Sequence, residues 1–166
     1  EEQIKKIILG MPAKSCPLDP APTWLVQASI TELIPIITRI VGLSLETSVM
    51  PSSLKTALIS PLIKKVGLDQ EVLKNYRPAS NLAFVSKVIE KVVAKQLTDH
   101  IIENNLHEIY QSAYKQRHST ETALLKVHSN ILSAIDSGKM VVLILLDLSA
   151  AFDTIDHTIL LSWLQN

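Results

Sequence analysis

The feature that most constrains the fold is a run of seven apolar residues at 140–146 that leads directly into a carboxylate, Asp147. The run is continuous and rich in β-branched side chains, which predicts a strand buried on both faces. A carboxylate at the end of such a strand is costly unless it is paired, hydrogen-bonded or bound to a metal. Asp147 is therefore the first candidate site residue, and simple capping of the following turn is the alternative interpretation.

The composition indicates a folded chain. Hydrophobic residues make up 47% of the 166 residues and charged residues 19%, which is enough for one domain with a core. Eight prolines and four glycines predict helices joined by stiff connections. The sequence contains neither a signal-peptide pattern nor an apolar stretch of membrane-spanning length. We therefore expect an intracellular protein of the nucleus or cytoplasm, without membrane partners.

Charge is unevenly distributed along the chain. Residues 51–130 carry 11 basic and 7 acidic side chains, whereas residues 131–166 carry 1 basic and 4 acidic ones. A basic segment followed by a small acidic one suits phosphate binding beside a metal site. An excess of this size also arises by chance, so the charge pattern alone leaves both interpretations open.

Hydrophobic periodicity predicts helices over residues 1–9, 23–46, 83–104, 120–137 and 156–165, the second of them broken near Pro35. The first helix begins the chain, Thr23 and Ser119 are expected caps, and Gly138 is expected to end its helix in a left-handed conformation. Four prolines within residues 12–22 exclude regular structure there. Residues 55–65 and 77–81 are expected to be extended, and Pro61 predicts an edge or bulged strand.

The residues from Asp147 onward carry a longer pattern. The stretch Asp-Leu-Ser-Ala-Ala-Phe-Asp-Thr-Ile-Asp-His at 147–157 resembles the first palm motif of LINE-type (non-LTR retrotransposon) reverse transcriptases. Four further stretches resemble motifs of that family in the same order: Lys-Ser-Cys-Pro-Leu-Asp-Pro-Ala-Pro at 14–22, Lys-Asn-Tyr-Arg-Pro-Ala-Ser at 74–80, Ser-Lys-Val-Ile-Glu-Lys at 86–91 and Gln-Ser-Ala-Tyr at 111–114. The chain departs from the family pattern at Ala113, where Gly is usual, and at Tyr114, where Phe is usual.

The resemblance implies a fold. We expect an α+β, helix-rich chain with a few strands that forms part of a right-hand polymerase. Its parts would be a helical N-terminal extension at 1–54, the fingers at 55–138 and the start of the palm at 139–166. The apolar strand of a palm that lacks its later motifs would leave an exposed edge, which predicts poor solubility or folding that depends on a partner.

The resemblance also implies RNA-directed DNA synthesis by two-metal nucleotidyl transfer. Asp147 and the backbone carbonyl of Leu148 would bind Mg²⁺, with Mn²⁺ as the alternative ion. Hard oxygen ligands of this kind suit Mg²⁺. Asp153 is expected to bond locally, and Asp156 to cap the last helix.

Further residues would bind the substrates. The nucleotide-binding residues implied by the resemblance are Arg77, Lys65 or its neighbour Lys64, Phe152, Gln111 and Tyr114. The spacing to Gly67 favours Lys65 over Lys64, and a solvated strand end is the alternative for both lysines. Phe152 would exclude a 2′-hydroxyl, with a core phenylalanine as the alternative. Lys14, Ser15 and Asp19 belong to the segment that helps to hold template RNA.

The partners implied are an RNA template, a DNA primer, deoxynucleotides and the remainder of the polymerase. The family's other metal carboxylates come from a later Ala-Asp-Asp motif, and these 166 residues contain no Asp-Asp pair. The 166-residue chain alone is therefore expected to be inactive. The alternatives are a catalytically dead module that still binds RNA and an inert relic of a retroelement.

Overall fold

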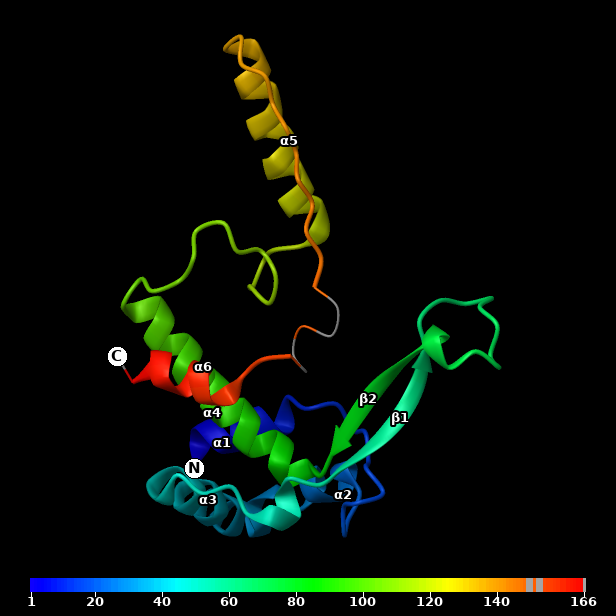
Figure 1. Ribbon diagram of the computed structural model, residues 1–166. Coiled ribbons are helices and arrows are strands. Elements are labelled where there is room, and N and C mark those ends of the chain that lie inside the picture. Colours follow the sequence, from blue (N-terminus) through cyan, green and yellow to red (C-terminus); the bar gives the residue numbers. More distant parts are fainter. Residues whose placement is uncertain (149–150, 152–153, 166) are drawn as a thin grey trace. The chain divides into compact units, whose positions relative to one another are not determined.

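The computed structural model describes residues 1–148, 151 and 154–165. The chain divides into two compact units, residues 1–107 and residues 108–166. Among these described residues, the first unit contains four α-helices and a two-stranded hairpin, and the second contains two α-helices (Figure 1). The helix-rich composition with few strands agrees with the expected α+β class.

The core of the first unit is formed by four helices: α1 (Glu2–Leu9), α2 (Thr23–Ala28), α3 (Ile30–Thr47) and α4 (Phe84–Glu103). Helices α1 and α3 contact each other, and both contact α4. The buried side chains recur three and four residues apart, so each helix turns one apolar stripe inward. They are Ile4, Ile8, Met11, Val26, Ile30, Ile34, Ile37, Val41, Phe84, Val88, Ile89 and Val92.

Two helix expectations need correction. The predicted helix at 23–46 is two helices that meet at Ser29, and Pro35 lies inside α3 without ending it. A proline removes one backbone hydrogen bond, and the buried stripe along α3 offsets that loss. Thr23 is not the cap of α2 but its first residue, after Pro22. Its hydroxyl instead donates to the carbonyl of Lys14 at 2.7 Å.

The hairpin consists of β1 (Ala57–Ile63) and β2 (Tyr76–Leu82), which pair antiparallel. One 3₁₀ turn, η1 (Ser52–Leu54), precedes it, and another, η2 (Leu73–Asn75), leads into β2. In this register Pro61 lies opposite Pro78. The Lys64 N–H donates to the Asn75 carbonyl at 2.8 Å, so the proline pair falls at a non-hydrogen-bonded position of the alternating ladder.

The prolines therefore remove no bond between the two strands. Their missing N–H groups instead lie on the outer edges of the hairpin, where a further strand would pair. Two prolines on unpaired edges oppose the addition of another strand there. The expected edge strand at Pro61 is confirmed.

The second unit contains α5 (Thr120–Asp136) and α6 (His157–Leu164). Ser119 caps α5 in a reciprocal capping box with Thr122. At the other end, Gly138 has a φ of 72°, and the N–H groups of Gly138 and Lys139 donate back to the carbonyls of Ile135 and Ala134. This is the Schellman arrangement that favours glycine, and both expected ends of α5 are confirmed.

The expected buried strand at 140–146 is wrong for this structure. After Gly138 the chain runs back from the end of α5 without forming a strand (Figure 1). Its side chains are exposed, Met140 by 99% and Leu146 by 91%. An extended segment becomes a buried strand only when neighbouring strands satisfy its backbone, and within the described residues β1 and β2 pair only with each other.

Among the described helices, none has the length and apolar character needed to cross a membrane.

Candidate functional site

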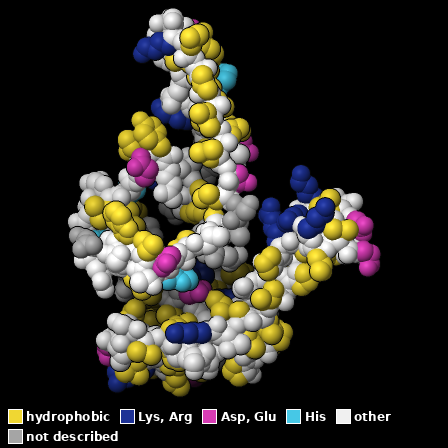
Figure 2. Space-filling view, in the orientation of Figure 1, with side chains coloured by type: hydrophobic (Ala, Val, Ile, Leu, Met, Phe, Trp, Pro, Cys, Tyr) yellow, Lys and Arg dark blue, Asp and Glu magenta, His cyan; other side chains and the backbone are white. Residues whose placement is uncertain are grey.

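The far end of the β1–β2 hairpin carries a group of exposed cations. Lys64 and Lys65 follow β1, Lys74 lies in η2, and Arg77 is the second residue of β2. Figure 2 shows lysine and arginine side chains gathered over this end of the hairpin, with acidic side chains beside them. Four cations within one loop and two strand ends make a surface suited to phosphate oxygens.

The two neighbouring lysines, Lys64 and Lys65, differ in their hydrogen bonding. Arg77 pairs with Leu62, and side chains two residues apart share a face, so Lys64 lies on the same face as Arg77. The Lys64 ammonium, however, donates to the carbonyl of Lys74 at 2.6 Å, across the end of the hairpin. Lys65 makes no such bond within the described part of the chain and is free to meet a ligand.

The loop that joins the strands is held by its own polar side chains. The Asp69 carboxylate accepts from the Glu71 N–H at 2.9 Å, and the Asn75 side-chain amide donates to the Asp69 carbonyl at 2.8 Å. The Tyr76 hydroxyl donates to the carbonyl of Gln70 at 3.0 Å. Asn75 and Tyr76 belong to the Asn-Tyr-Arg-Pro motif, where only Arg77 had been assigned a role. Their bonds show that they shape the loop in front of Arg77.

The template segment contains two exposed side chains and one carboxylate that is held by hydrogen bonds. Lys14 and Ser15 are exposed, and so remain available for a ligand. Asp19 is not available in the same way, because its two carboxylate oxygens accept from the backbone N–H groups of Cys16, at 3.1 Å, and Phe84, at 2.6 Å. A role for Asp19 in holding RNA directly is therefore not supported.

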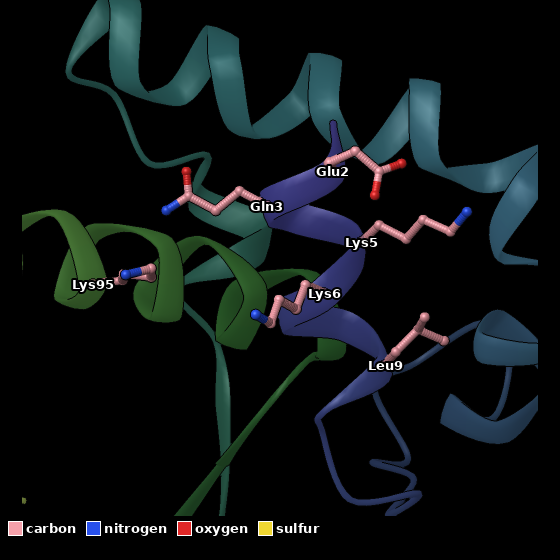
Figure 3. A pocket seen from close by; sticks show the side chains of 6 residues that line it. All are labelled: Glu2, Gln3, Lys5, Lys6, Leu9 and Lys95. Atoms are coloured by element: carbon pink, nitrogen blue, oxygen red, sulfur yellow. The ribbon is translucent and has the colours of Figure 1, made fainter.

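The first unit also has a pocket over α1 and α4, lined by Glu2, Gln3, Lys5, Lys6, Leu9 and Lys95. Figure 3 shows the side chains of Lys5 and Lys6 pointing in different directions. The Lys95 ammonium is paired with the Asp99 carboxylate at 2.8 Å. Because its cations do not converge on one point, this pocket is a poor candidate for a substrate site.

In the second unit, Gln111 and Tyr114 are exposed. The Gln111 side-chain amide donates to the Ala113 carbonyl at 3.2 Å. Tyr114 has a left-handed backbone with a φ of 60°, one residue after the alanine that replaces the usual glycine. A bulky residue with positive φ is uncommon, so this turn is held in a strained conformation at a predicted nucleotide-pocket position.

Asp147 and Leu148 are both exposed. Within residues 1–148, 151 and 154–165, no group of three or more acidic, histidine or cysteine side chains is close enough to hold a metal ion. Asp156 accepts from the N–H groups of Thr158 and Ile159 at 2.8 and 3.2 Å, so its expected role as the α6 cap is confirmed. Phe152 and Asp153 lie outside the described residues.

The predicted nucleotide- and metal-binding residues that the structure describes thus fall into two groups. Arg77, Lys64 and Lys65 share one end of the hairpin in the first unit, while Gln111, Tyr114 and Asp147 belong to the second. The hairpin offers cations for phosphate, and the second unit offers one carboxylate with an adjacent carbonyl for a hard cation.

Comparison with known families gives a match that spans both groups. Residues 63–166 match the family described as reverse transcriptase (RNA-dependent DNA polymerase). No solved structure matches the chain.

Three proteins of Drosophila melanogaster are similar to this chain. A probable RNA-directed DNA polymerase from transposon BS is 29% identical over 97% of this chain. A probable RNA-directed DNA polymerase from transposon X-element is 31% identical over 64% of this chain, and the RNA-directed DNA polymerase from mobile element jockey is 26% identical over 94%. The matched regions are 18%, 12% and 17% of those proteins, so the chain spans less than a fifth of each.

Proposed function

Since this chain belongs to the reverse transcriptase (RNA-dependent DNA polymerase) family, we propose that it supplies the fingers and the start of the palm of a LINE-type RNA-directed DNA polymerase. The observation that carries the proposal is the family match over residues 63–166, which includes both the cationic hairpin end and Asp147. The transposon relatives agree with the LINE-type motifs. The division into an extension at 1–54, fingers at 55–138 and palm at 139–166, and the right-hand arrangement, are parts of this proposal.

In this proposal the hairpin binds the triphosphate of an incoming deoxynucleotide. The Arg77 guanidinium can meet two phosphate oxygens at once, which a lysine cannot do. Lys65 adds a second cation, and Lys64 braces the end of the hairpin through its bond to the Lys74 carbonyl. Phe152, Gln111 and Tyr114 would shape the nucleotide pocket, and Lys14 and Ser15 would contact the template RNA.

Asp147 would be one carboxylate ligand of a catalytic divalent cation, with the Leu148 carbonyl beside it. Both offer hard oxygen donors and both are exposed, so the donor chemistry fits Mg²⁺, or Mn²⁺ in its place. Such ions activate the primer 3′-hydroxyl and stabilise the leaving oxygen in nucleotidyl transfer. Asp147 would contribute a negative charge next to the backbone carbonyl of Leu148. One carboxylate is not a complete two-metal site.

The phosphate role is tested by measuring deoxynucleoside triphosphate binding to residues 1–166 by calorimetry. Arg77→Ala should lower the affinity about tenfold or more, because a charge-assisted bidentate contact contributes about 1.5–3 kcal/mol. Lys65→Ala should lower it less, and Lys91→Ala, an exposed lysine of α4, is the matched control. Equal affinities for all four proteins would refute the assignment of the hairpin.

The catalytic role is tested in a polypeptide that carries this sequence followed by an Ala-Asp-Asp motif. Asp147→Asn should abolish primer extension on an RNA template and leave RNA binding unchanged. Synthesis by that variant would exclude the metal-ligand role. We also propose that residues 1–166 alone make no DNA, because they contain no Asp-Asp pair, and primer extension by the purified chain would overturn that statement.

The alternative function is RNA binding without catalysis. It is favoured by the excess of basic side chains in residues 51–130 and by the exposed cations of the hairpin. Binding that weakens steeply as salt rises would indicate phosphate contacts. A chain that binds neither RNA nor a triphosphate would instead fit an inert relic of a retroelement.

A further inference from the structure

The N-terminal end of α4 is capped by a residue from a distant part of the sequence. The local cap position is Ala83, whose side chain cannot accept a hydrogen bond. The carboxylate of Asp19 takes that role instead, accepting from the Phe84 N–H at 2.6 Å across 65 residues of sequence. A negative charge at this end of a helix is also favoured by the helix dipole. Asp19 therefore joins the proline-rich segment to the start of α4.

The same carboxylate stabilises the segment that it belongs to. Its other oxygen accepts from the Cys16 N–H at 3.1 Å, and the Asp19 N–H donates to the Cys16 carbonyl at 2.9 Å. The Cys16 thiol in turn donates to the Asn81 carbonyl at 3.6 Å. Because Asn81 is next to the last residue of β2, the turn at 16–19 contacts both sides of the β2–α4 junction.

The entry to β1 is attached to the same helix. The hydroxyl of Ser86, which is fully buried, donates to the carbonyl of Leu54 at 2.7 Å. Leu54 ends the 3₁₀ turn that precedes β1. Both strands of the hairpin are therefore anchored at their bases to the first turn of α4, one through Ser86 and the other through Asp19 and Cys16.

The orientation of the hairpin depends on the anchors at its base. Beyond the base, β1 and β2 contact mainly each other rather than the helices. Figure 1 shows the two strands extending away from the helices. Each strand has seven residues, which is about 23 Å at about 3.3 Å per residue. A tilt of about 10° at the base would thus move the far end, with Arg77 and the lysines, by about 4 Å.

We propose that Asp19 is a positioning residue that fixes the angle between the β1–β2 hairpin and α4, and through it the place of the hairpin cations. This inference rests on the proposed function only for its consequence, the alignment of the cations with a triphosphate. The geometric part stands on the bonds that Asp19 and Cys16 make at the base of β2.

The test measures the hairpin directly. Spin labels are placed at two exposed positions, Val66→Cys in the hairpin loop and Lys91→Cys in α4, in a Cys16→Ser background whose hydroxyl can still donate to Asn81. Pulsed electron resonance then gives the distribution of distances between the labels. Asp19→Ala should broaden this distribution about twofold, because the base of the hairpin loses its ordering contacts.

Two further variants keep the result decisive. Asp19→Asn retains one acceptor oxygen and should give an intermediate width. Asp99→Ala also removes a carboxylate, one that pairs with Lys95 on the exposed face of α4, and should leave the width unchanged. Circular dichroism checks that the helices remain. If Asp19→Ala does not fold, the width for Asp19→Asn decides by itself.

Unchanged widths for the folded Asp19 variants would overturn the proposal. Tripolyphosphate affinity, measured by calorimetry on the same proteins without labels, provides the second result. It should fall several-fold for Asp19→Ala, although Asp19 is far in sequence from the hairpin cations, and it should not fall for Asp99→Ala. If the unsubstituted chain does not bind tripolyphosphate, the phosphate role of the hairpin fails, and the distance distribution still decides the role of Asp19.

Discussion

The side chain of Gln27 offers a sharp test of how the first unit is held together. Its amide nitrogen, on α2, donates to the carbonyl of Ile8 at 2.9 Å and to that of Met11 at 2.8 Å. The Ile8 carbonyl lies in the last turn of α1, where the last carbonyls of a helix lack partners within the helix, and the Met11 carbonyl lies just beyond the helix. The Ile8 carbonyl also accepts from the Met11 N–H at 3.1 Å, whereas the Met11 carbonyl has Gln27 as its donor.

The magnitudes follow from those bonds. Gln27→Ala removes two neutral hydrogen bonds from a half-buried site, and one carbonyl keeps another donor, so we expect a loss of about 1–2 kcal/mol in the free energy of unfolding. Gln27→Glu has nearly the same shape but no donor at pH 7, and it directs a negative charge at two carbonyl oxygens. We expect it to lose about 3 kcal/mol at pH 7.

The stability loss caused by Gln27→Glu should depend on pH. Two carbonyls facing the substituted carboxyl favour its protonated form, so its pKa is higher in the folded state than in the unfolded state. The protonated group can donate one bond. The loss caused by Gln27→Glu should therefore be smallest below the unfolded pKa and grow as the pH rises through the folded pKa.

Urea unfolding followed by circular dichroism, at pH 7 and at pH 4, measures these losses. Gln3→Glu, an exposed position of α1, introduces the same change without removing a donor from a carbonyl and should stay within about 0.5 kcal/mol of the unsubstituted chain. Equal stabilities of Gln27→Glu and Gln3→Glu at pH 7, or a loss for Gln27→Glu that grows as the pH falls, would refute this role of Gln27.

Three further predictions concern the core and α5. Val88→Ala, at a fully buried position of α4, should lower the free energy of unfolding in urea by about 2–3 kcal/mol, and a loss under about 0.5 kcal/mol would contradict its place in the core. Gly138→Ala meets no atom within 4 Å, so only its positive φ opposes it, and protection of the last turn of α5 in hydrogen exchange should fall by about 1 kcal/mol. A hydrogen bond from the Ser119 side chain lowers the pKa of Glu121 below its ordinary 4.5. The ionised Glu121 carboxylate therefore stabilises α5 fully above pH 4.5, and this stabilisation is lost as the pH falls through the lowered pKa. Ser119→Ala should return that pKa toward 4.5 in an NMR titration, and an unchanged titration would exclude the bond.

Much of the candidate site could be predicted from sequence because its signals are local or carried by motifs. The extended segments at 55–65 and 77–81 formed the two strands, and their pairing places Lys64 on the face of Arg77. The roles of Asn75 and Tyr76 could not be predicted, because their hydrogen bonds depend on how the loop at 66–75 closes. The Asn-Tyr-Arg-Pro motif marks Asn75 and Tyr76 as part of a conspicuous segment, but it does not show which carbonyls their side chains bond to.

The sequence patterns also could not predict the long-range contacts, because these contacts depend on how distant parts of the chain come together. Asp19 was expected beside template RNA, but its carboxylate caps α4. Periodicity describes which face of a helix is apolar, and it contains no information on which distant residue completes a cap. Ser86 was counted only as part of a motif, yet it is buried and attaches the turn before β1 to α4.

The sequence by itself determined the elements whose stabilising contacts lie within a few residues. These are the apolar stripes of the helices, the capping box at Ser119 and the left-handed Gly138. It also determined the family, because the motifs survive in order along the chain. Tertiary structure decided what depends on groups far apart: the break at Ser29, the cap from Asp19, and the exposed state of residues 140–146. An apolar run predicts that burial is favourable, but only neighbouring strands that satisfy its backbone can bury it.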